Sequence, residues 1–158
     1  MTREATLTYS AAKAKAENYC AFQERSQQEV RQKLYAWGLG YMEVENLLAE
    51  LINEGFLNEE RFAVAYAGGR HRMKKWGKFK IKQGLKQKAV SDPLIRIALE
   101  SLDPDEYREN LLDLLAKKAR TLSEKDPFKR KIKLQNYALG KGYEQSLTIE
   151  LLNDNELH

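Results

Sequence analysis

Cysteine and histidine are nearly absent from this 158-residue chain. Cys20 is the single cysteine, and His71 and His158 are the two histidines. A lone cysteine excludes an intramolecular disulfide, and these three side chains make a poor set for a structural zinc site. We therefore expect no disulfide, no metal and no cofactor. Cys20 follows an alanine-rich segment and is expected to be a small buried apolar group.

Sequence patterns typical of enzymes are also missing. The chain contains no P-loop, no Gly-x-Ser-x-Gly turn and no His-Glu-x-x-His zinc-binding pattern. With so little histidine, the sequence favours a role other than catalysis.

Long apolar runs are absent as well. Residues 1–9 lack the apolar core of a signal peptide, and no run approaches the ~20 apolar residues that a membrane span needs. No heptad repeat indicates a coiled-coil dimer. The sequence thus predicts a cytoplasmic monomer without a membrane segment.

Proline is limited to Pro93, Pro104 and Pro127, so helices can form over most of the chain. Apolar residues recur at helical spacing, and no alternating strand pattern is present. A capping box, in which Ser26 and Glu29 bond each other's free amides, is among the helix-start signals. The helices group into residues 10–54, 55–102 and 103–153, and we expect the ends, 1–9 and 154–158, to be flexible.

The three groups resemble one another. Leu34 and Gly38 are followed 51 residues later by Leu85 and Ala89, and Gly142 follows Gly38 by 104 residues. Each group alone is too small to bury much apolar surface, so neighbouring groups should pack together. We therefore predict an all-α fold of three tandem three-helix repeats in an elongated or curved array.

Positive charge is concentrated in the middle repeat. The chain carries a net charge of +4, but residues 55–102 hold 11 basic and 4 acidic groups, and residues 70–88 hold nine basic groups and no acidic one. A field of one sign attracts a polyanion or an acidic partner, although most charge runs are simply solvated helix faces. The predicted binding residues are Arg70, Arg72, Lys74, Lys75, Lys78, Phe79, Lys80, Lys82, Lys86 and Lys88.

Two parts of this prediction have alternatives. At roughly 100° per residue, a helix starting at Gly77 points Phe79 away from Ile81, where the ring could stack on a base. Alternatively, the ring folds back onto Trp76 or the preceding helix. A second basic patch either extends the same track or only solubilises the third repeat; its residues are Lys129, Arg130, Lys131 and Lys133.

Residues 55–63, Gly-Phe-Leu-Asn-Glu-Glu-Arg-Phe-Ala, resemble the signature of the RecX family. Residues 77–81 and 85–90 are similar to the next helix of that family, and the resemblance extends over residues 10–152 in register. The residues that carry it are Leu57, Arg61, Phe62, Ala63, Gly77, Ile81 and Leu85. From its position one turn after Asn58, Arg61 is expected to pair with nearby acidic groups rather than to contact a partner.

The resemblance implies a regulator of RecA, the recombinase that polymerises on single-stranded DNA. RecX-like proteins consist of three tandem three-helix modules that lie in the groove of the RecA filament. They inhibit its ATPase, coprotease and strand-exchange activities, with roles in homologous recombination, DNA repair and the SOS response. The implied partners are the RecA filament and single-stranded DNA, with double-stranded DNA as a further candidate.

Two other functions fit the helical repeats. The first is a helix-turn-helix DNA-binding protein, but residues 41–53 and 92–102, which would read the bases, are acidic or mainly apolar. The second is an adaptor that binds only protein, for which binding should be insensitive to salt.

Two positions depart from the family pattern. Gly84 stands where glutamate is usual, and a glycine within a helix should cost about 1 kcal/mol relative to alanine. Ala89 stands where glycine is usual and lacks the preference for a left-handed helix cap. We expect both to lower the stability of the basic helix.

Overall fold

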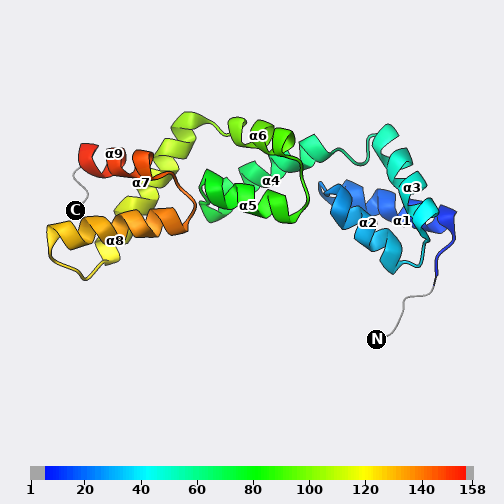
Figure 1. Cartoon of the computed structure of the whole chain (residues 1–158), viewed down its shortest axis with the longest axis horizontal. Helices are drawn as coiled ribbons and strands as arrows, with labels where there is room; N and C mark the ends of the chain where they lie inside the picture. The colour runs from blue at the N-terminus through cyan, green and yellow to red at the C-terminus, as the bar shows by residue number, and fades with distance from the viewer. Residues whose placement is uncertain (1–5, 156–158) are drawn as a thin grey trace.

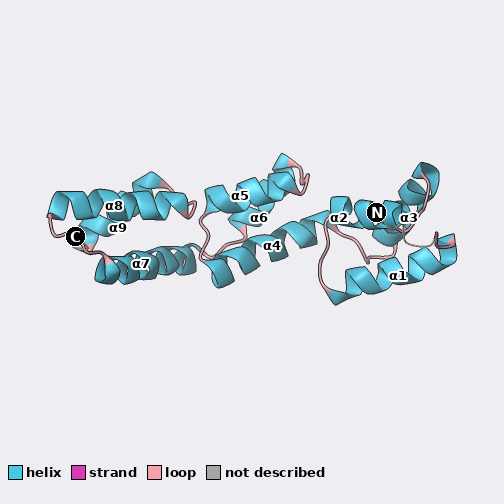
Figure 2. Ribbon diagram, turned by 90° about the horizontal axis from the view of Figure 1, so that it is seen from below, coloured by secondary structure: helices cyan, strands magenta, loops and turns pink. Residues whose placement is uncertain are grey.

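The computed structural model describes residues 6–155, and this part of the chain contains nine α-helices and no strand. The helices are α1 (Tyr9–Phe22), α2 (Gln27–Ala36), α3 (Tyr41–Asn53), α4 (Glu59–Lys74), α5 (Lys78–Gln87), α6 (Asp92–Glu100), α7 (Pro104–Thr121), α8 (Pro127–Gly140) and α9 (Gln145–Asp154). They form three consecutive groups, α1–α3, α4–α6 and α7–α9, which we call modules 1, 2 and 3. The modules follow one another in an elongated row (Figures 1 and 2), so the all-α, three-repeat prediction is confirmed.

The ends predicted to be flexible lie partly outside the described residues, at 1–5 and 156–158. Within the described part, the Leu7 amide donates to the Trp37 carbonyl at 3.0 Å. The sequence offers Ser10 as a helix cap, since serine is a favoured residue at that position. Helix α1 instead begins at Tyr9, because the Thr8 hydroxyl accepts a hydrogen bond from the Ala11 amide at 3.1 Å.

The repeat is visible in the turn that follows the second helix of each module. Gly38, Ala89 and Gly142 occupy equivalent places and all have positive φ, at 92°, 59° and 97°. The next amide donates to the carbonyl five residues earlier, as in a Schellman turn: Leu39 to Leu34, Val90 to Leu85, and Tyr143 to Ala138. Ala89 therefore adopts the left-handed conformation without the glycine that usually permits it, which costs an L residue roughly 1–2 kcal/mol.

The buried apolar residues form two clusters. Module 1 has its own core, which runs from Ala12 to Leu57 and includes Cys20, as predicted, at 6% exposure. Modules 2 and 3 share a single core, from Phe62 to Leu152. The contacts between modules 1 and 2 therefore differ in kind from those between modules 2 and 3.

Four aromatic residues lie on the apolar stripes of the helical pattern, which predicts that they belong to the core: Trp37, Tyr41, Tyr66 and Tyr107. Trp37 and Tyr107 are buried at 5% and 3% exposure, and Tyr66 is half-buried. Tyr41 was assigned wrongly, since 68% of it is exposed. It is the first residue of α3, where no preceding helical turn covers its side chain.

Polar contacts connect modules 1 and 2. The Ser26 hydroxyl accepts from the Glu29 amide at 3.1 Å, but the Glu29 carboxylate does not complete the predicted capping box. Instead, it pairs with Lys88 of module 2 at 3.1 Å. The Gln27 amide donates to the Glu59 carboxylate at 3.1 Å, across the same junction.

Modules 2 and 3 meet backbone to backbone at two glycines. The Gly77 amide donates to the Lys141 carbonyl at 2.7 Å, and the Phe79 amide donates to the Gly142 carbonyl at 2.9 Å. A Cβ added to Gly77 would overlap the backbone of Gly142 and Tyr143, and one added to Gly142 would lie 2.6 Å from the Lys80 amide nitrogen. Neither position has room for a side chain.

An aromatic cluster surrounds this backbone contact. The His71 ring stacks on Tyr107 with centroids 5.0 Å apart, and Tyr107 lies 5.2 Å from Tyr143. The Tyr107 hydroxyl accepts from the Lys78 amide at 3.0 Å and donates to the Glu144 carboxylate. Burial, and then that carboxylate, raise the pKa of the Tyr107 hydroxyl, so it remains a proton donor.

His71 is buried at 2% exposure with both ring nitrogens bonded. Nδ1 lies 2.9 Å from the Trp76 carbonyl, and Nε2 lies 2.9 Å from the Asn110 amide nitrogen. Asn110 in turn accepts from the Lys75 ammonium at 3.1 Å, which fixes the orientation of its amide group. This histidine therefore joins α4 to α7.

We predict that Gly77→Ala lowers the free energy of unfolding by about 1–3 kcal/mol, because the added methyl group forces the two backbones apart. Urea denaturation followed by circular dichroism measures the loss. Gly40→Ala is the matched control: Gly40 also caps a helix, with φ −81° against −82° at Gly77, and a Cβ there meets nothing closer than 3.9 Å. Equal losses in the two variants would contradict the steric explanation.

We predict that Ala89→Gly stabilises the protein by about 0.5–1 kcal/mol, because glycine adopts positive φ without the strain of a Cβ atom. The midpoint of thermal unfolding should rise. Ala65→Gly, on an exposed position of the right-handed helix α4, should instead destabilise by about 1 kcal/mol. A loss of stability in Ala89→Gly would show that this turn is not strained.

Candidate functional site

The ten predicted binding residues lie on the last turns of α4, on the connection that follows it and along α5. Arg72, Lys74, Lys82 and Lys86 are exposed, whereas the other basic side chains are half-buried. We call this set of ten residues the basic segment. Helix α5 is held by Ile81 and Leu85, which are fully buried in the core that modules 2 and 3 share. Its charged side chains are thereby left facing outward.

Trp76 lies at the centre of the basic segment, although it was not among the predicted site residues. Its ring centroid lies 5.4 Å from the Arg70 guanidinium, 5.5 Å from the Lys74 ammonium and 5.0 Å from the Lys80 ammonium. Each of these cation–π contacts contributes about 0.5–1 kcal/mol at an exposed site. The indole therefore holds cationic side chains of α4 and α5 close together, although their like charges repel one another. The signal in the sequence was an aromatic residue at the middle of a run of like charges.

Arg70 lies against two rings. Its guanidinium is 4.8 Å from the Tyr66 ring centroid as well as near Trp76. Its Nε atom is buried and has no hydrogen-bond partner among the described residues. Arg70 is therefore positioned by stacking rather than by an acidic group.

Phe79 is largely exposed, at 59%. Its backbone amide is fixed on Gly142, but its ring projects from the first turn of α5. The sequence left two arrangements open, a ring that points away from the core and a ring that folds back onto Trp76 or the preceding helix. This exposure favours the first.

Three members of the basic segment have partners elsewhere in the chain. Lys88 pairs with Glu29, 59 residues earlier in the sequence. Lys75 bonds Asn110, and the Lys78 ammonium lies 5.0 Å from the Tyr107 ring. No acidic residue lies within the run itself. These three lysines are nevertheless not free, because residues of the neighbouring modules serve as their partners.

The second basic patch is divided. Lys129 and Lys133 are exposed, and Lys131 bonds the Asn153 side chain. Arg130 instead turns toward the loop between α7 and α8, where it donates to the backbone carbonyls of Ala119, Leu122 and Glu124 at 2.5–2.9 Å. Arg130 thus stabilises a loop rather than forming part of an open surface.

The signature residues at 55–63 build the fold. Leu57, Phe62 and Ala63 are buried. Arg61 bonds Glu24 at 2.5 Å and the Gly55 carbonyl at 3.0 Å, as expected for a residue that pairs within the chain. This stretch therefore joins module 1 to α4.

Gly84 has a packing role that helix propensity alone did not predict. A Cβ atom at this position would overlap the Tyr66 hydroxyl group of α4. The missing side chain lets Tyr66, and the Arg70 guanidinium stacked on it, approach α5 closely.

Among residues 6–155, none of the helices combines the length and the apolar composition that a membrane span requires. The same range brings no three His, Cys, Asp or Glu side chains together in a way that could hold a metal ion.

Comparison with known proteins covers nearly the whole chain. Family models described as the first, second and third three-helix domains of RecX match residues 12–51, 58–99 and 105–152. The three matches cover 40, 42 and 48 of the 158 residues. They follow one another along the chain as first, second and third domain.

Two curated relatives are similar along most of the chain. The regulatory protein RecX of Clostridium acetobutylicum is 29% identical over 150 residues, which is 92% of this chain and 69% of the relative. The regulatory protein RecX of Bacillus mycoides is 25% identical over 130 residues, 82% of this chain. The chain spans about half the length of the Bacillus relatives, at 48%.

The fold matches solved structures. The crystal structure of RecX from Lactobacillus salivarius superposes with a TM-score of 0.87 at 22% identity, covering 95% of this chain and 97% of that one. A second crystal structure of a regulatory protein RecX gives 0.80 at 23% identity, covering 92% and 73%.

Proposed function

Because the chain belongs to the RecX family, we propose that it binds the filament of RecA on single-stranded DNA and inhibits or modulates the ATPase, coprotease and recombinase activities of RecA. It would act as a cytoplasmic monomer in homologous recombination, DNA repair and the SOS response. The observation that carries the proposal is the match of three consecutive RecX domains to a row of modules whose middle member exposes basic helices.

The basic segment supplies the means of binding. Arg72, Lys74, Lys82 and Lys86 are exposed, and no acidic group lies within ion-pair distance of them among residues 6–155. Such side chains can neutralise phosphates and release the counterions that condense on a nucleic acid. Binding to the filament would therefore weaken as the salt concentration rises, unlike binding by a purely protein-directed adaptor.

The helices that a helix-turn-helix protein would insert into the major groove do not suit that role. Exposed positions on α3 carry Tyr41, Met42 and Glu43, and those on α6 carry Asp92 and Glu100 among others. Carboxylates facing phosphates repel them, so sequence-specific reading of a duplex is disfavoured.

We predict that the protein inhibits RecA ATPase on single-stranded DNA, and that the variant Lys74→Gln, Lys82→Gln, Lys86→Gln raises the half-inhibitory concentration at least about tenfold. A titration of RecA ATPase measures both values. The control removes three exposed charges elsewhere, at Lys15, Lys33 and Lys125, and should change inhibition less than about twofold. No inhibition by the unchanged protein at several-fold excess over RecA would refute the proposed function.

We predict that Phe79→Ala weakens binding to a fluorescent oligo(dT) by about five- to hundredfold, because a stacked base contributes ~1–3 kcal/mol. Fluorescence anisotropy gives the affinity, and Phe79→Trp should retain it. Met73→Ala is the control, since Met73 is 86% exposed on the neighbouring helix α4. Unchanged affinity in a folded Phe79→Ala protein would exclude base stacking by this ring.

A further inference from the structure

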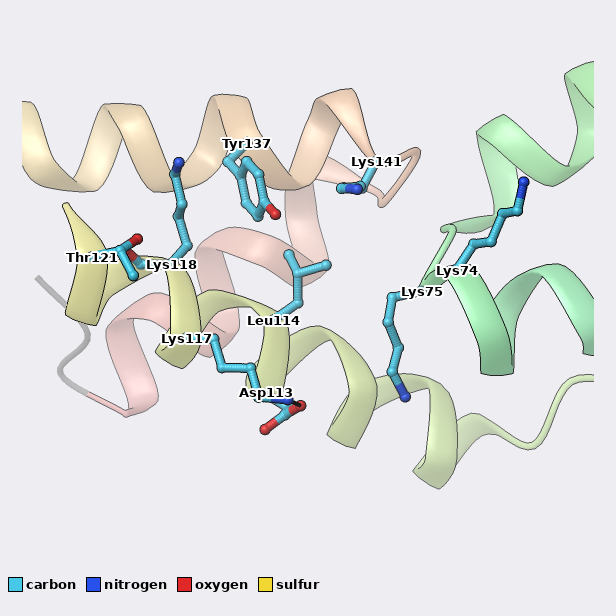
Figure 3. A pocket seen from close by; sticks show the side chains of 9 residues that line it. All are labelled: Lys74, Lys75, Asp113, Leu114, Lys117, Lys118, Thr121, Tyr137 and Lys141. Atoms are coloured by element: carbon cyan, nitrogen blue, oxygen red, sulfur yellow. Dashed lines mark hydrogen bonds and ion pairs between the residues drawn. The ribbon is translucent and has the colours of Figure 1, made fainter.

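A cavity of about 390 Å³ between modules 2 and 3 is lined by five lysines. Lys74 and Lys75 come from the end of α4, Lys117 and Lys118 from α7, and Lys141 from the end of α8 (Figure 3). Only Lys74 and Lys75 belong to the basic segment. No stretch of the sequence brings these lysines together, because Lys75 and Lys117 are 42 residues apart and Lys118 and Lys141 are 23 residues apart.

The cavity carries a surplus of positive charge. Its single carboxylate, Asp113, accepts from the Lys117 ammonium at 2.9 Å, and this hydrogen bond lowers the pKa of Asp113 and keeps it ionised. Five lysines and one carboxylate thus line the cavity. Among the described residues, Lys74, Lys118 and Lys141 have no acidic group within 4.0 Å.

The lysines are positioned by their neighbours. The Tyr137 ring lies between two of them, with its centroid 4.8 Å from the Lys118 ammonium and 5.8 Å from that of Lys141. Lys75 is held in a left-handed conformation, φ 57°, and the Tyr143 hydroxyl bonds its carbonyl at 2.9 Å. An L residue is strained there, so packing between the modules enforces the position of this lysine.

The helix ends explain how such a site persists without an anion. Lys75 and Lys141 are the C-terminal caps of α4 and α8, where the helix dipole places partial negative charge. These dipoles offset part of the repulsion at two of the five lysines. Lys117 is paired with Asp113, so the charges of Lys118 and Lys74 are the ones that favour an external anion.

We propose that this cavity binds adjacent phosphate groups, and that in the filament these belong to the backbone of a single-stranded nucleic acid. The assignment to the filament rests on the proposed function. Lysine ammonium groups bind phosphate as point charges and need no fixed orientation of the ligand. Lys74 lines the cavity and also belongs to the basic segment, where it contacts Trp76, so one strand could follow both surfaces without a break.

Binding here would have a structural consequence. The phosphates would contact lysines of both modules 2 and 3, and so would bind best when the Gly77–Gly142 contact is intact. A basic patch confined to one module has no such dependence.

The test compares two double variants with the same change of charge. Lys118→Gln with Lys141→Gln alters the cavity, and Lys15→Gln with Lys33→Gln alters exposed positions of module 1 outside it. Anisotropy with fluorescent oligo(dT), in the absence of RecA, should show an affinity loss of about tenfold for the cavity variant and less than about twofold for the control. The slope of log affinity against log salt should fall by about 1.4, since each single-strand phosphate contact contributes about 0.7.

Two further arms complete the experiment. Lys118→Arg with Lys141→Arg preserves charge and should restore binding, which separates charge from folding. Pyrophosphate should raise the melting temperature of the unchanged protein but not that of the cavity variant. If pyrophosphate binding alone is lost while oligo(dT) affinity is unchanged, the cavity takes a free polyphosphate and not a nucleic acid.

Equal effects of the cavity and control variants on both ligands would overturn the proposal. RecA is absent from these assays, so that result is distinct from a failure to inhibit RecA. The reverse also holds, since a protein that leaves RecA unaffected can still bind phosphate at this cavity.

Discussion

The contact between Gly77 and Gly142 is the constraint on which modules 2 and 3 depend. It lets two backbones hydrogen-bond at 2.7 and 2.9 Å where any side chain would keep them apart. Because the backbones touch, Tyr107 can reach the Lys78 amide and Tyr143 can reach the Lys75 carbonyl. The shared core, the aromatic cluster around His71 and the lysine cavity all follow from this close approach.

Module 1 is attached by weaker means. Its contacts with module 2 include the ion pairs Lys88–Glu29 and Arg61–Glu24, and its apolar core is separate. Partly exposed ion pairs contribute about 0–1 kcal/mol each and are screened by salt. Lys88 also belongs to the basic segment, so a phosphate that attracts Lys88 competes with Glu29. Phosphate binding of the proposed kind on module 2 would thereby be coupled to the attachment of module 1, whereas module 3 is held by backbone hydrogen bonds and a shared apolar core.

Local features of the fold could be predicted from the sequence, because periodic apolar residues and turn positions act over short distances. The constant offset between Gly38 and Ala89 corresponds to equivalent left-handed turns, and Arg61 pairs within the chain as expected. Features set by distant residues could not be predicted. Glu29 was assigned to its own helix cap but bonds Lys88, and Tyr41 satisfies a helical pattern yet lies at an uncovered helix start.

The same reasoning applies to the candidate site. Charge density along the chain located the basic segment but not its geometry, which depends on Trp76 and on Gly84. Lys141 was not recognised because it lies in a near-neutral module and becomes part of a charged surface only where α8 meets α4. A run of charge is visible in sequence, whereas a convergence of separate lysines requires the arrangement of the modules.

Lys75 and Ala89 are the non-glycine residues with positive φ among residues 6–155, and they lie on either side of α5. Both positions would be less strained with glycine, so each carries a cost in stability of roughly 1–2 kcal/mol. At Ala89 the structure offers no compensating contact. At Lys75 the compensation is visible, because glycine there would remove the ammonium that bonds Asn110 and faces the cavity. The strain at Lys75 is therefore offset by a hydrogen bond within the network around His71, and the same lysine lines the cavity that we propose as a phosphate site.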